Sequence, residues 1–398
     1  MRKTRGLLSA FIIGSLLFLS TSPVTPILNR TSIHYMNDGE DVIEKTSLKN
    51  GIQPKSEFLE APRALLGGPW KKTLQPLDEG PHFHRLLPVR EWWYFNVVFD
   101  KPDSGLRNWS VMVSFNYMSK SFDDPDILFV TLYDDRGRTY GGMSTRQRGV
   151  LQATGPGVDV KFENSWVKGV YPQWNLHIED GDADLEHEII LDFSFEAECS
   201  PYWVIMNTGH GCSLSPMGYY SINHCDVTGS LMLDGECYEI HGSGYHDHTW
   251  ALYMIGGASF FWDWFSVHFD NGLHAFIWQI IPLGKEEARS ISPGFCWITD
   301  GRNFTDIRFF TMNHLEFENT SIPGFKRPKL FHVVSVFLGG EIDLYLETKT
   351  MHEYLWEDIP VIDIALWEGS CVVTGTIRID DEVFDIEGLG VSEILRII

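Results

Sequence analysis

Positive charge is scarce in this chain, and that scarcity excludes a large class of proteins. The 398 residues carry 31 Lys+Arg against 54 Asp+Glu, which gives a formal net charge of −23. A protein that binds nucleic acid needs a basic face to meet phosphates, so we predict no nucleic-acid partner. The 43% of apolar residues excludes a disordered chain. The length is sufficient for two domains of roughly 150 residues each.

The short motifs of several enzyme classes are also absent. The sequence has no G-x-S-x-G elbow, no glycine-rich phosphate loop, no dinucleotide fingerprint, no H-E-x-x-H and no C-x-x-C. We therefore predict no cofactor and no metal. The six cysteines fit either one or two disulfides or small buried thiols, and their pairing cannot be deduced from their spacing. They are Cys199, Cys212, Cys225, Cys237, Cys296 and Cys371.

The N-terminus has the pattern of an export signal. Arg2, Lys3 and Arg5 precede an apolar run over residues 6–19, and small residues follow it. This order is typical of a secretory signal, and the run is short for a helix that spans a membrane. We predict that residues 1–22 are a signal peptide or an N-terminal anchor. The protein is then secreted or otherwise extracytoplasmic, or is held near a membrane by residues 6–19. Residues 23–80 are polar and read as a linker or arm.

The rest of the sequence has the alternation of β-strands. Apolar residues at odd positions from Trp109 to Tyr117 alternate with mostly polar ones, which is the period of a half-buried strand. Similar short apolar runs recur, and Asp270-Asn271-Gly272 joins two of them with the signal of a tight type I′ hairpin. No convincing amphipathic helix is present beyond short pieces. These patterns predict an all-β chain with mostly antiparallel pairing.

The sequence also repeats itself. Residues 227–245 and 373–391 are identical at eight of nineteen positions, with turns at Asp234-Gly235 and Asp380-Asp381. Residues 92–100 resemble 262–270 in the same order along the chain. The repeat predicts two related β domains, a first over 81–250 and a second over 251–398. Each has the size of a small antiparallel barrel or sandwich that can hold one small ligand.

The densest group of reactive side chains lies where the first copy ends. On a strand, Tyr245 and Asp247 share one face, while His246, His248 and Trp250 share the other. An aspartate surrounded by apolar side chains has a raised pKa and can donate a proton to an alkene. The π faces of nearby aromatic rings would then stabilise the carbocation that forms.

Two other interpretations of this group stay open. Histidine and aspartate are metal ligands, and His82-Phe83-His84 could supply more, but the split over two faces disfavours a metal. A carboxylate that caps the domain linker through backbone N–H groups is the simpler alternative. The second copy ends in GLGVSEI (388–394), so we expect the polar cluster in the first copy alone.

A second group is the aromatic run that follows Arg90. Trp92 and Tyr94 share one strand face, and Trp93 and Phe95 share the other. We expect one pair to fill the core of the first domain. The other pair should pack between the domains or line the opening of the barrel. Glu91 needs a partner, because a buried carboxylate is costly alone.

Together these motifs resemble the hydroxyneurosporene synthase (carotenoid 1,2-hydratase) family, whose relatives include AttH-type lipocalin-like proteins, kievitone hydratase and fungal Diels–Alderases. The resemblance rests on EWWYFN (91–96), YYS (219–221), the Gly-x-Gly-Tyr-x-Asp-His-x-Trp run at 242–250, Trp367-Glu368-Gly369 and the terminal GLGVSEI. It implies two tandem lipocalin-like domains. It also implies that Asp247, in its Tyr-x-Asp motif, protonates an isoprenoid double bond before water adds.

One feature departs from those hydratases. Their upstream His-x-Trp pair falls on Gly218 and Tyr220 here, so Tyr219, Tyr220 and His224 are the candidates to replace it. The resemblance therefore does not specify carotenoid hydration, and kinship alone does not establish catalysis.

We therefore expect an exported, lipocalin-like protein with an aromatic-lined cavity at the domain junction and an apolar small-molecule ligand. The leading hypothesis is a cofactor-independent hydratase (hydro-lyase) acting on an isoprenoid-like or polyketide-like molecule. Asp247 is its general acid, Tyr245 orients that acid, and His248 positions water, a role that His246 could share. Glu91 supports the site. The side chains expected to line the ligand site are Trp92, Trp93, Tyr94, Tyr220, His246 and Trp250. The alternatives are a non-catalytic carrier of an apolar ligand and a structural surface protein without a cavity.

Overall fold

The computed structural model describes residues 74–82, 89–117, 125–180, 186–205, 217–252, 260–282, 294–307, 309–356 and 364–397. The predicted signal segment, residues 1–22, and the arm up to residue 73 lie outside these ranges. Within them, no helix is both long enough and apolar enough to cross a membrane. Apart from the short helix α3 (Pro76–Glu79), every regular element of the described residues is a strand, which confirms the all-β prediction.

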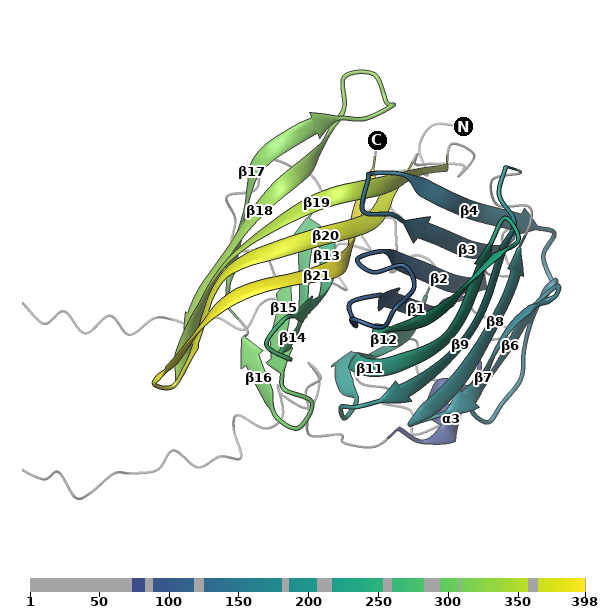
Figure 1. Ribbon diagram of the computed structural model, residues 1–398, viewed down its shortest axis with the longest axis horizontal. Coiled ribbons are helices and arrows are strands. Elements are labelled where there is room, and N and C mark those ends of the chain that lie inside the picture. The colour runs from purple at the N-terminus through teal and green to yellow at the C-terminus, as the bar shows by residue number, and fades with distance from the viewer. Residues whose placement is uncertain are drawn as a thin grey trace, which may run out of the picture. The chain divides into compact units, whose positions relative to one another are not determined.

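The first sheet has twelve strands and contains residues 89 to 252 (Figure 1). Its order is β4-β3-β2-β1-β12-β11-β9-β8-β7-β6-β5, with β10 paired to β11. The described strands pair antiparallel. Their bounds are β1 (Val89–Val98), β2 (Ser110–Tyr117), β3 (Asp126–Tyr133), β4 (Thr139–Arg146), β5 (Leu151–Ala153), β6 (Val158–Phe162), β7 (Ser165–Val170), β8 (Gln173–Asp180), β9 (Ile189–Ala197), β10 (Tyr202–Ile205), β11 (Met217–Leu233) and β12 (Glu236–Leu252).

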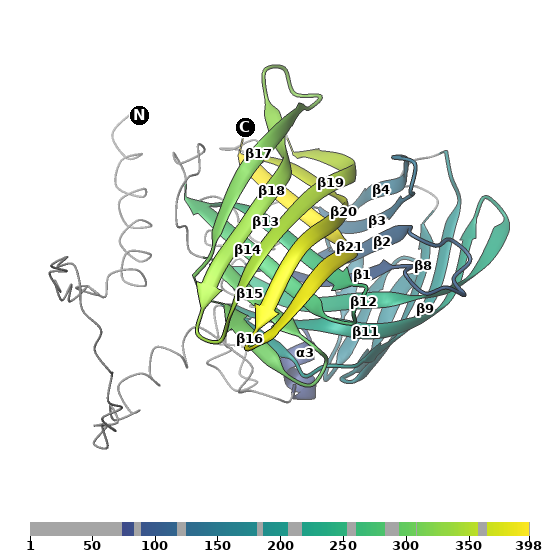
Figure 2. The same ribbon diagram turned by 60° about the vertical axis from the view of Figure 1, so that its left-hand side comes forward.

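The second sheet has nine strands and contains residues 260 to 397 (Figure 2). Its order is β16-β15-β14-β13-β21-β20-β19-β18-β17. The bounds are β13 (Phe260–Phe269), β14 (His274–Pro282), β15 (Gly294–Thr299), β16 (Phe304–Ile307), β17 (Thr311–Asn319), β18 (Lys326–Phe337), β19 (Gly340–Trp356), β20 (Ile364–Ile379) and β21 (Glu382–Ile397).

The two sheets share one strand order. In each, three strands lead inward to the first strand of the sheet (β1 or β13). That strand pairs with the last strand (β12 or β21), and the strand before the last (β11 or β20) comes next. The hairpins of residues 227–245 and 373–391 occupy the same place in both orders. This is the arrangement that a duplicated unit would produce, and the duplication itself stays a prediction.

The predicted hairpin turns form, with one difference in geometry. Asp234 and Gly235 have φ of 53° and 82°, as a type I′ turn requires, and Asp380 has φ of 53°. At Asp270-Asn271-Gly272 only the glycine has a positive φ, 82°. The Leu273 N–H there bonds the Asn271 side chain at 3.1 Å. The hairpin is therefore confirmed, but its turn is a longer loop closed by one left-handed glycine, since the asparagine side chain satisfies the backbone instead.

Buried side chains form three clusters. One fills the first sheet, including Trp93, Phe95, Trp174 and Trp250, and another fills the second sheet. The third mixes residues of both sheets. Its members include Tyr94, Tyr219 and Tyr245 from the first sheet and Trp264, Phe276, Trp297 and Val391 from the second. The two sheets therefore bury an aromatic-rich surface against each other.

The cysteines follow the simpler of the two expectations over the described residues. Cys199, Cys225, Cys296 and Cys371 are buried free thiols, and Cys237 is an exposed one. Cys212 lies outside the described residues. Burial raises the pKa of Cys199 and Cys371 to about 12, so these thiols stay protonated and behave as small apolar side chains.

Inside the second sheet, one buried carboxylate is held by an arginine and a histidine. Asp263 accepts hydrogen bonds from Arg396 at 2.7 Å and from His314 at 2.8 Å. Burial opposes its charge, but the charges and hydrogen bonds of Arg396 and His314 outweigh that effect and lower its pKa. Arg396 also donates to the Trp262 and Leu395 carbonyls at 2.9 Å. The carboxylate thus neutralises a guanidinium that the fold has already removed from water.

We expect Asp263→Ala to lower the free energy of unfolding by about 3–5 kcal/mol, because Arg396 would be left buried without its counterion. Denaturant unfolding measures the change. Glu341→Ala is the matched control, since it breaks an exposed carboxylate–arginine pair with Arg378 in the same sheet. That variant should unfold close to the wild-type midpoint. Equal effects of the two substitutions would contradict the assignment.

Candidate functional site

Strand β12 carries the predicted site on two faces. Its neighbours are β1 and β11, which place Tyr94 and Ser221 on either side of Asp247, and Trp93 and Tyr220 on either side of His248. Tyr245 and Tyr94 belong to the cluster shared by both sheets, whereas Trp93 and Trp250 belong to the core of the first sheet. The predicted alternation is confirmed for β1 and β12.

Asp247 lies where the two sheets meet and is held by two phenols. Tyr245 donates a hydrogen bond to Asp247 Oδ2 at 2.8 Å, and Tyr219 donates to the same oxygen at 3.2 Å. The Trp264 indole N–H, from the second sheet, donates to the Tyr219 hydroxyl at 3.3 Å. A chain of donors therefore runs from the second sheet to a carboxyl of the first.

The surroundings of Asp247 favour its neutral form. The residue is 4% exposed, and burial raises the pKa of its carboxyl well above the usual value. The hydrogen bond from Tyr245 lowers that pKa in part, Glu393 raises it, and Tyr219 and Trp92 lower it further. Oδ1 makes no regular hydrogen bond within the described chain. The carboxyl therefore favours its protonated form.

Two glutamates of the second sheet complete an acidic group that the sequence analysis did not select. Glu368 and Glu393 are cross-strand partners on β20 and β21. Burial raises the pKa of Glu368 well above its usual value and that of Glu393 to about 7, and Asp247 adds to the rise at Glu368. The Trp262 indole donates to Glu393 Oε1. Three carboxyls thus share one apolar interface.

The signal for Glu393 was present in the sequence. Extending the repeat 227–245 and 373–391 by two residues aligns Asp247 with Glu393, just as the 92–100 and 262–270 repeat aligns Trp92 with Trp262. The polar cluster that we expected in the first copy alone therefore has one counterpart in the second copy. The second copy keeps the carboxyl, and replaces the phenol at Tyr245 by Val391.

Aromatic rings surround these carboxyls. The ring centroids of Tyr245 and Trp264 are 5.1 Å apart in an edge-to-face arrangement. Tyr94 contacts Trp264 at 5.5 Å and Tyr245 at 6.0 Å, also edge to face. Trp92 packs against the same cluster. The acid is therefore enclosed by aromatic side chains, two of which, Tyr245 and Tyr219, also donate hydrogen bonds to it.

The second face of β12 points into the first sheet, away from Asp247. His246 contacts the Tyr94 carbonyl at 3.0 Å and the Tyr220 hydroxyl at 3.3 Å, and it stacks on Phe95. Burial lowers the pKa of His246 to about 3, so the ring is neutral. The structure therefore does not bring His246 or Tyr220 beside the acid.

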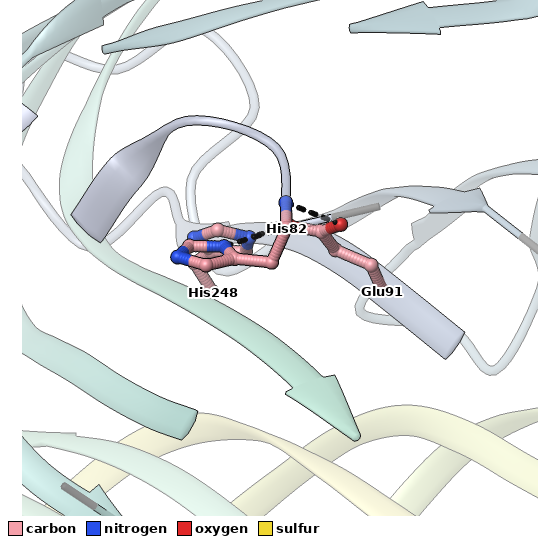
Figure 3. Close-up of side chains that lie close together, drawn as sticks. All are labelled: His82, Glu91 and His248. Carbon is pink, nitrogen blue, oxygen red and sulfur yellow. Dashed lines mark hydrogen bonds and ion pairs between the residues drawn. The ribbon is translucent and has the colours of Figure 1, made fainter. Parts of the chain in front are cut away.

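His248 lies on this inner face too, in a three-residue cluster shown in Figure 3. Its Nε2 is 2.8 Å from Glu91 Oε1, and His82 Nδ1 is 3.1 Å from the same oxygen. Glu91 thereby has the partner that the sequence demanded. Burial opposes its charge, but the two imidazoles beside it outweigh burial and lower its pKa. The role predicted for His248 beside Asp247 does not fit this geometry.

The position that the resemblance matches to a hydratase histidine is closed to any side chain. A Cβ on Gly218 would meet the ring of Trp250 at 2.1 Å, so the indole needs a glycine there. His224 stacks instead on His274, with centroids 3.7 Å apart. Of the three candidates to replace that histidine, Tyr219 is the one that contacts Asp247.

The predicted ligand-lining set divides between the two faces. Trp92 and Tyr94 lie with Asp247 in the shared cluster. Trp93, Tyr220 and Trp250 are core residues of the first sheet. A hollow of about 520 Å³ lies elsewhere, on the second sheet. Its lining includes Phe309, Phe310, Val336, Ile342 and Thr376, so it is distinct from the site around Asp247.

The raised pKa of Glu393 should make the free energy of unfolding depend on pH. Its folded pKa of about 7 exceeds the ordinary 4.5, so its contribution to stability is complete below about pH 4.5 and is lost as the pH rises through about 7. We expect Glu393→Gln to remove part of the wild-type decline in unfolding free energy between pH 5 and 8, measured by urea denaturation at each pH.

The control for this measurement is Glu341→Gln. The exposed Glu341 carboxylate is paired with Arg378, which lowers its pKa, so its titration falls below this window. That variant should keep the wild-type slope. A Glu393→Gln protein with an unchanged slope would show that this carboxyl is already ionised at pH 5.

The comparisons with known proteins agree with this fold. The model of the AttH-like family matches residues 71–394. The structure is similar to that of a protein assigned as AttH from Nitrosomonas europaea, with a TM-score of 0.59, 18% identity, and coverage of 82% of this chain and 97% of that one. No curated protein sequence matches the chain.

Two further solved structures have the same architecture. Kievitone hydratase from Nectria haematococca has a TM-score of 0.57 and 13% identity, covering 83% of this chain and 95% of that chain. CghA, solved with Sch210972, has a TM-score of 0.53 and 11% identity, covering 83% and 97%. These identities establish a shared lipocalin-like fold and no activity. Since the family match spans most of its length, the chain belongs to the AttH-like family.

Proposed function

We propose that this protein is a cofactor-independent enzyme that protonates and hydrates a C=C bond of an apolar small molecule, with Asp247 as the general acid. The observation that carries the proposal is a buried carboxyl whose Oδ2 accepts from Tyr245 and Tyr219, while Oδ1 has no regular hydrogen bond to any described residue. A protonated carboxyl with one oxygen free of donors can deliver a proton to a substrate.

The proposed step balances with water as the only co-reactant. Asp247 gives its proton to one alkene carbon, and the π electrons form the new C–H bond. The cation that remains at the other carbon is stabilised by the aromatic rings of Tyr94, Trp92 and Trp264. Water then forms the C–O bond, and its proton returns to the Asp247 carboxylate. The reverse sequence is a dehydration, so the same site serves a hydro-lyase in either direction.

Tyr219 takes a larger part in this proposal than the sequence suggested. Tyr245 and Tyr219 hold Oδ2 and help the carboxylate form after proton transfer, because both donate to the charged state. Trp264 orients Tyr219 from the opposite sheet. Opening or shifting of the two sheets would therefore change the acid directly, which links the domain interface to the chemistry.

The relatives support the reaction class without fixing a substrate. One structure of this fold is named a hydratase, and another holds the small molecule Sch210972. Carotenoid hydration is the finer hypothesis that the motif resemblance suggests, and an isoprenoid-like or polyketide-like molecule is the broader one. We also propose that residues 1–22 export the protein.

The central test is Asp247→Asn, which keeps the shape of the side chain and removes the acid. We expect activity to fall by about 10²–10⁴-fold, and Tyr245→Phe to lower it by roughly tenfold. The assay offers isoprenoid-like and polyketide-like alkenes in ¹⁸O-labelled water and follows addition of one labelled water by mass spectrometry. Asp343→Asn is the control, since that aspartate forms an exposed pair with His332.

Two outcomes would reject the mechanism. Full activity in Asp247→Asn would mean that another group supplies the proton. Unchanged apolar material extracted from the purified wild type, together with no hydration of any alkene offered, would favour a carrier of an apolar ligand.

The pH profile gives an independent prediction. The active form is the protonated acid, so the rate should be high at low pH and fall as the pH rises through the raised pKa of Asp247. Tyr245→Phe removes a donor to the carboxylate and should move this fall to higher pH. Glu393→Gln removes a charge that raises the pKa and should move it to lower pH. Shifts in the same direction would contradict the assignment.

A further inference from the structure

Three segments of the chain place two imidazoles and one carboxylate around a single point. His82 follows α3, Glu91 lies on β1 and His248 on β12, and Figure 3 shows the three side chains converging. Their ligand atoms all lie within 4.8 Å of one another, and all three residues are buried. We propose that His82, Glu91 and His248 bind one divalent metal ion of the zinc class, which fastens the segment 74–82 to the first sheet.

The distances suit such an ion. Nitrogen and oxygen ligands about 2.0–2.1 Å from zinc stand roughly 3.3 Å apart in a tetrahedron. Glu91 Oε1 is 2.8 Å from His248 Nε2 and 3.1 Å from His82 Nδ1. Both distances from Glu91 Oε1 need to grow by a few tenths of an ångström to admit the ion, and all three ligand atoms already lie within 4.8 Å of one another. Two imidazoles and one carboxylate are also a ligand set that zinc uses in proteins.

The partners of His248 favour a positive ion beside its ring. Both ring nitrogens face groups that only accept: Nδ1 is 3.2 Å from the Asp78 carbonyl, and Nε2 is 2.8 Å from Glu91 Oε1. A neutral ring carries one N–H and can donate to only one of these two acceptors. With that N–H on Nδ1, the lone pair of Nε2 faces the carboxylate oxygen, and the two repel each other. A cation between them turns the repulsion into two bonds, and the Nδ1–H to a backbone carbonyl is the usual outer contact of a metal-bound histidine.

The position in the fold indicates a structural ion. Trp250 stacks on His82 at 3.6 Å and Trp93 stacks on His248 at 4.7 Å, so aromatic rings close the cluster. Nearby, Glu79 accepts from the Trp174 indole at 3.0 Å. Asp247 and its partners lie on the opposite face of β12, so the proposed ion takes no part in proton transfer. The ion would instead hold His82 and His248 in place against the rings of Trp250 and Trp93 in the core of the first sheet.

The rival explanation is an extra proton on His248, which would make an imidazolium–carboxylate pair. Both explanations satisfy Nε2 and Oε1. They differ in what else they require. A bound ion also contacts His82 Nδ1, and it makes the stability of the segment 74–82 depend on metal. A proton on His248 has neither effect. Metal dependence therefore separates the two.

The experiment uses the full chain, dialysed against a chelator and then titrated with Zn²⁺ by calorimetry. We expect one Zn²⁺ per chain and a higher midpoint of thermal unfolding with zinc bound. His82→Asn and His248→Gln should each raise the Kd by more than about a hundredfold, beyond the 10–100-fold of an outer contact. Bound Co²⁺ should show the visible absorption of a tetrahedral site.

His177→Gln is the matched control. His177 forms a surface pair with Asp192 at 2.7 Å, so the variant removes a histidine–carboxylate pair without touching the cluster. It should bind zinc as the wild type does. Because His248→Gln could fail to fold, His82→Asn, on a segment outside the sheet, keeps the test decisive. Absence of stoichiometric binding, or binding that is unchanged in a folded His82→Asn protein, would overturn the proposal.

Discussion

The period of two along β12 is the constraint on which this structure depends. Adjacent residues of a strand point to opposite faces, so a run of four reactive side chains must serve two environments. Tyr245 and Asp247 enter the interface between the sheets, whereas His246 and His248 enter the first core. The neighbouring strand β1 alternates in register, with Tyr94 beside Asp247 and Trp93 beside His248. An acid site and a histidine cluster are thus built back to back on one pair of strands.

Much of the fold could be predicted because it follows from local patterns. The alternation of apolar and polar residues predicted the strands. Asp-Gly at 234–235 predicted a hairpin with a type I′ turn, and both residues adopt the positive φ that this turn needs. At Asn271 the same logic predicted the hairpin but not the turn geometry, since a side-chain hydrogen bond to Leu273 N–H competed with the backbone preference. Local rules therefore place a turn more reliably than they fix its shape.

The sites were harder to predict because their members come from distant segments. Asp247 and Tyr245 are neighbours in sequence, and the face they share was readable. Glu393 contacts the same interface from the last strand, and only the repeat alignment points to it. His82 could be named as a possible metal ligand beside the histidines of β12, but no local pattern paired it with Glu91. Spacing along one strand identifies a face, but not what the rest of the chain brings to that face.

Asp247 and Glu393 occupy matching positions in the two copies of the repeat, and this bears on how a molecule between them would be oriented. Two identical chains related by a two-fold axis would present the same residue, with the same neighbours and the same proton affinity, at both positions. A single chain that carries both positions is free of that requirement. Here one carboxyl accepts from two phenols and the other from an indole. In the proposed reaction, such an asymmetric pair would give the substrate a defined donor end, so that it would be protonated on one side only.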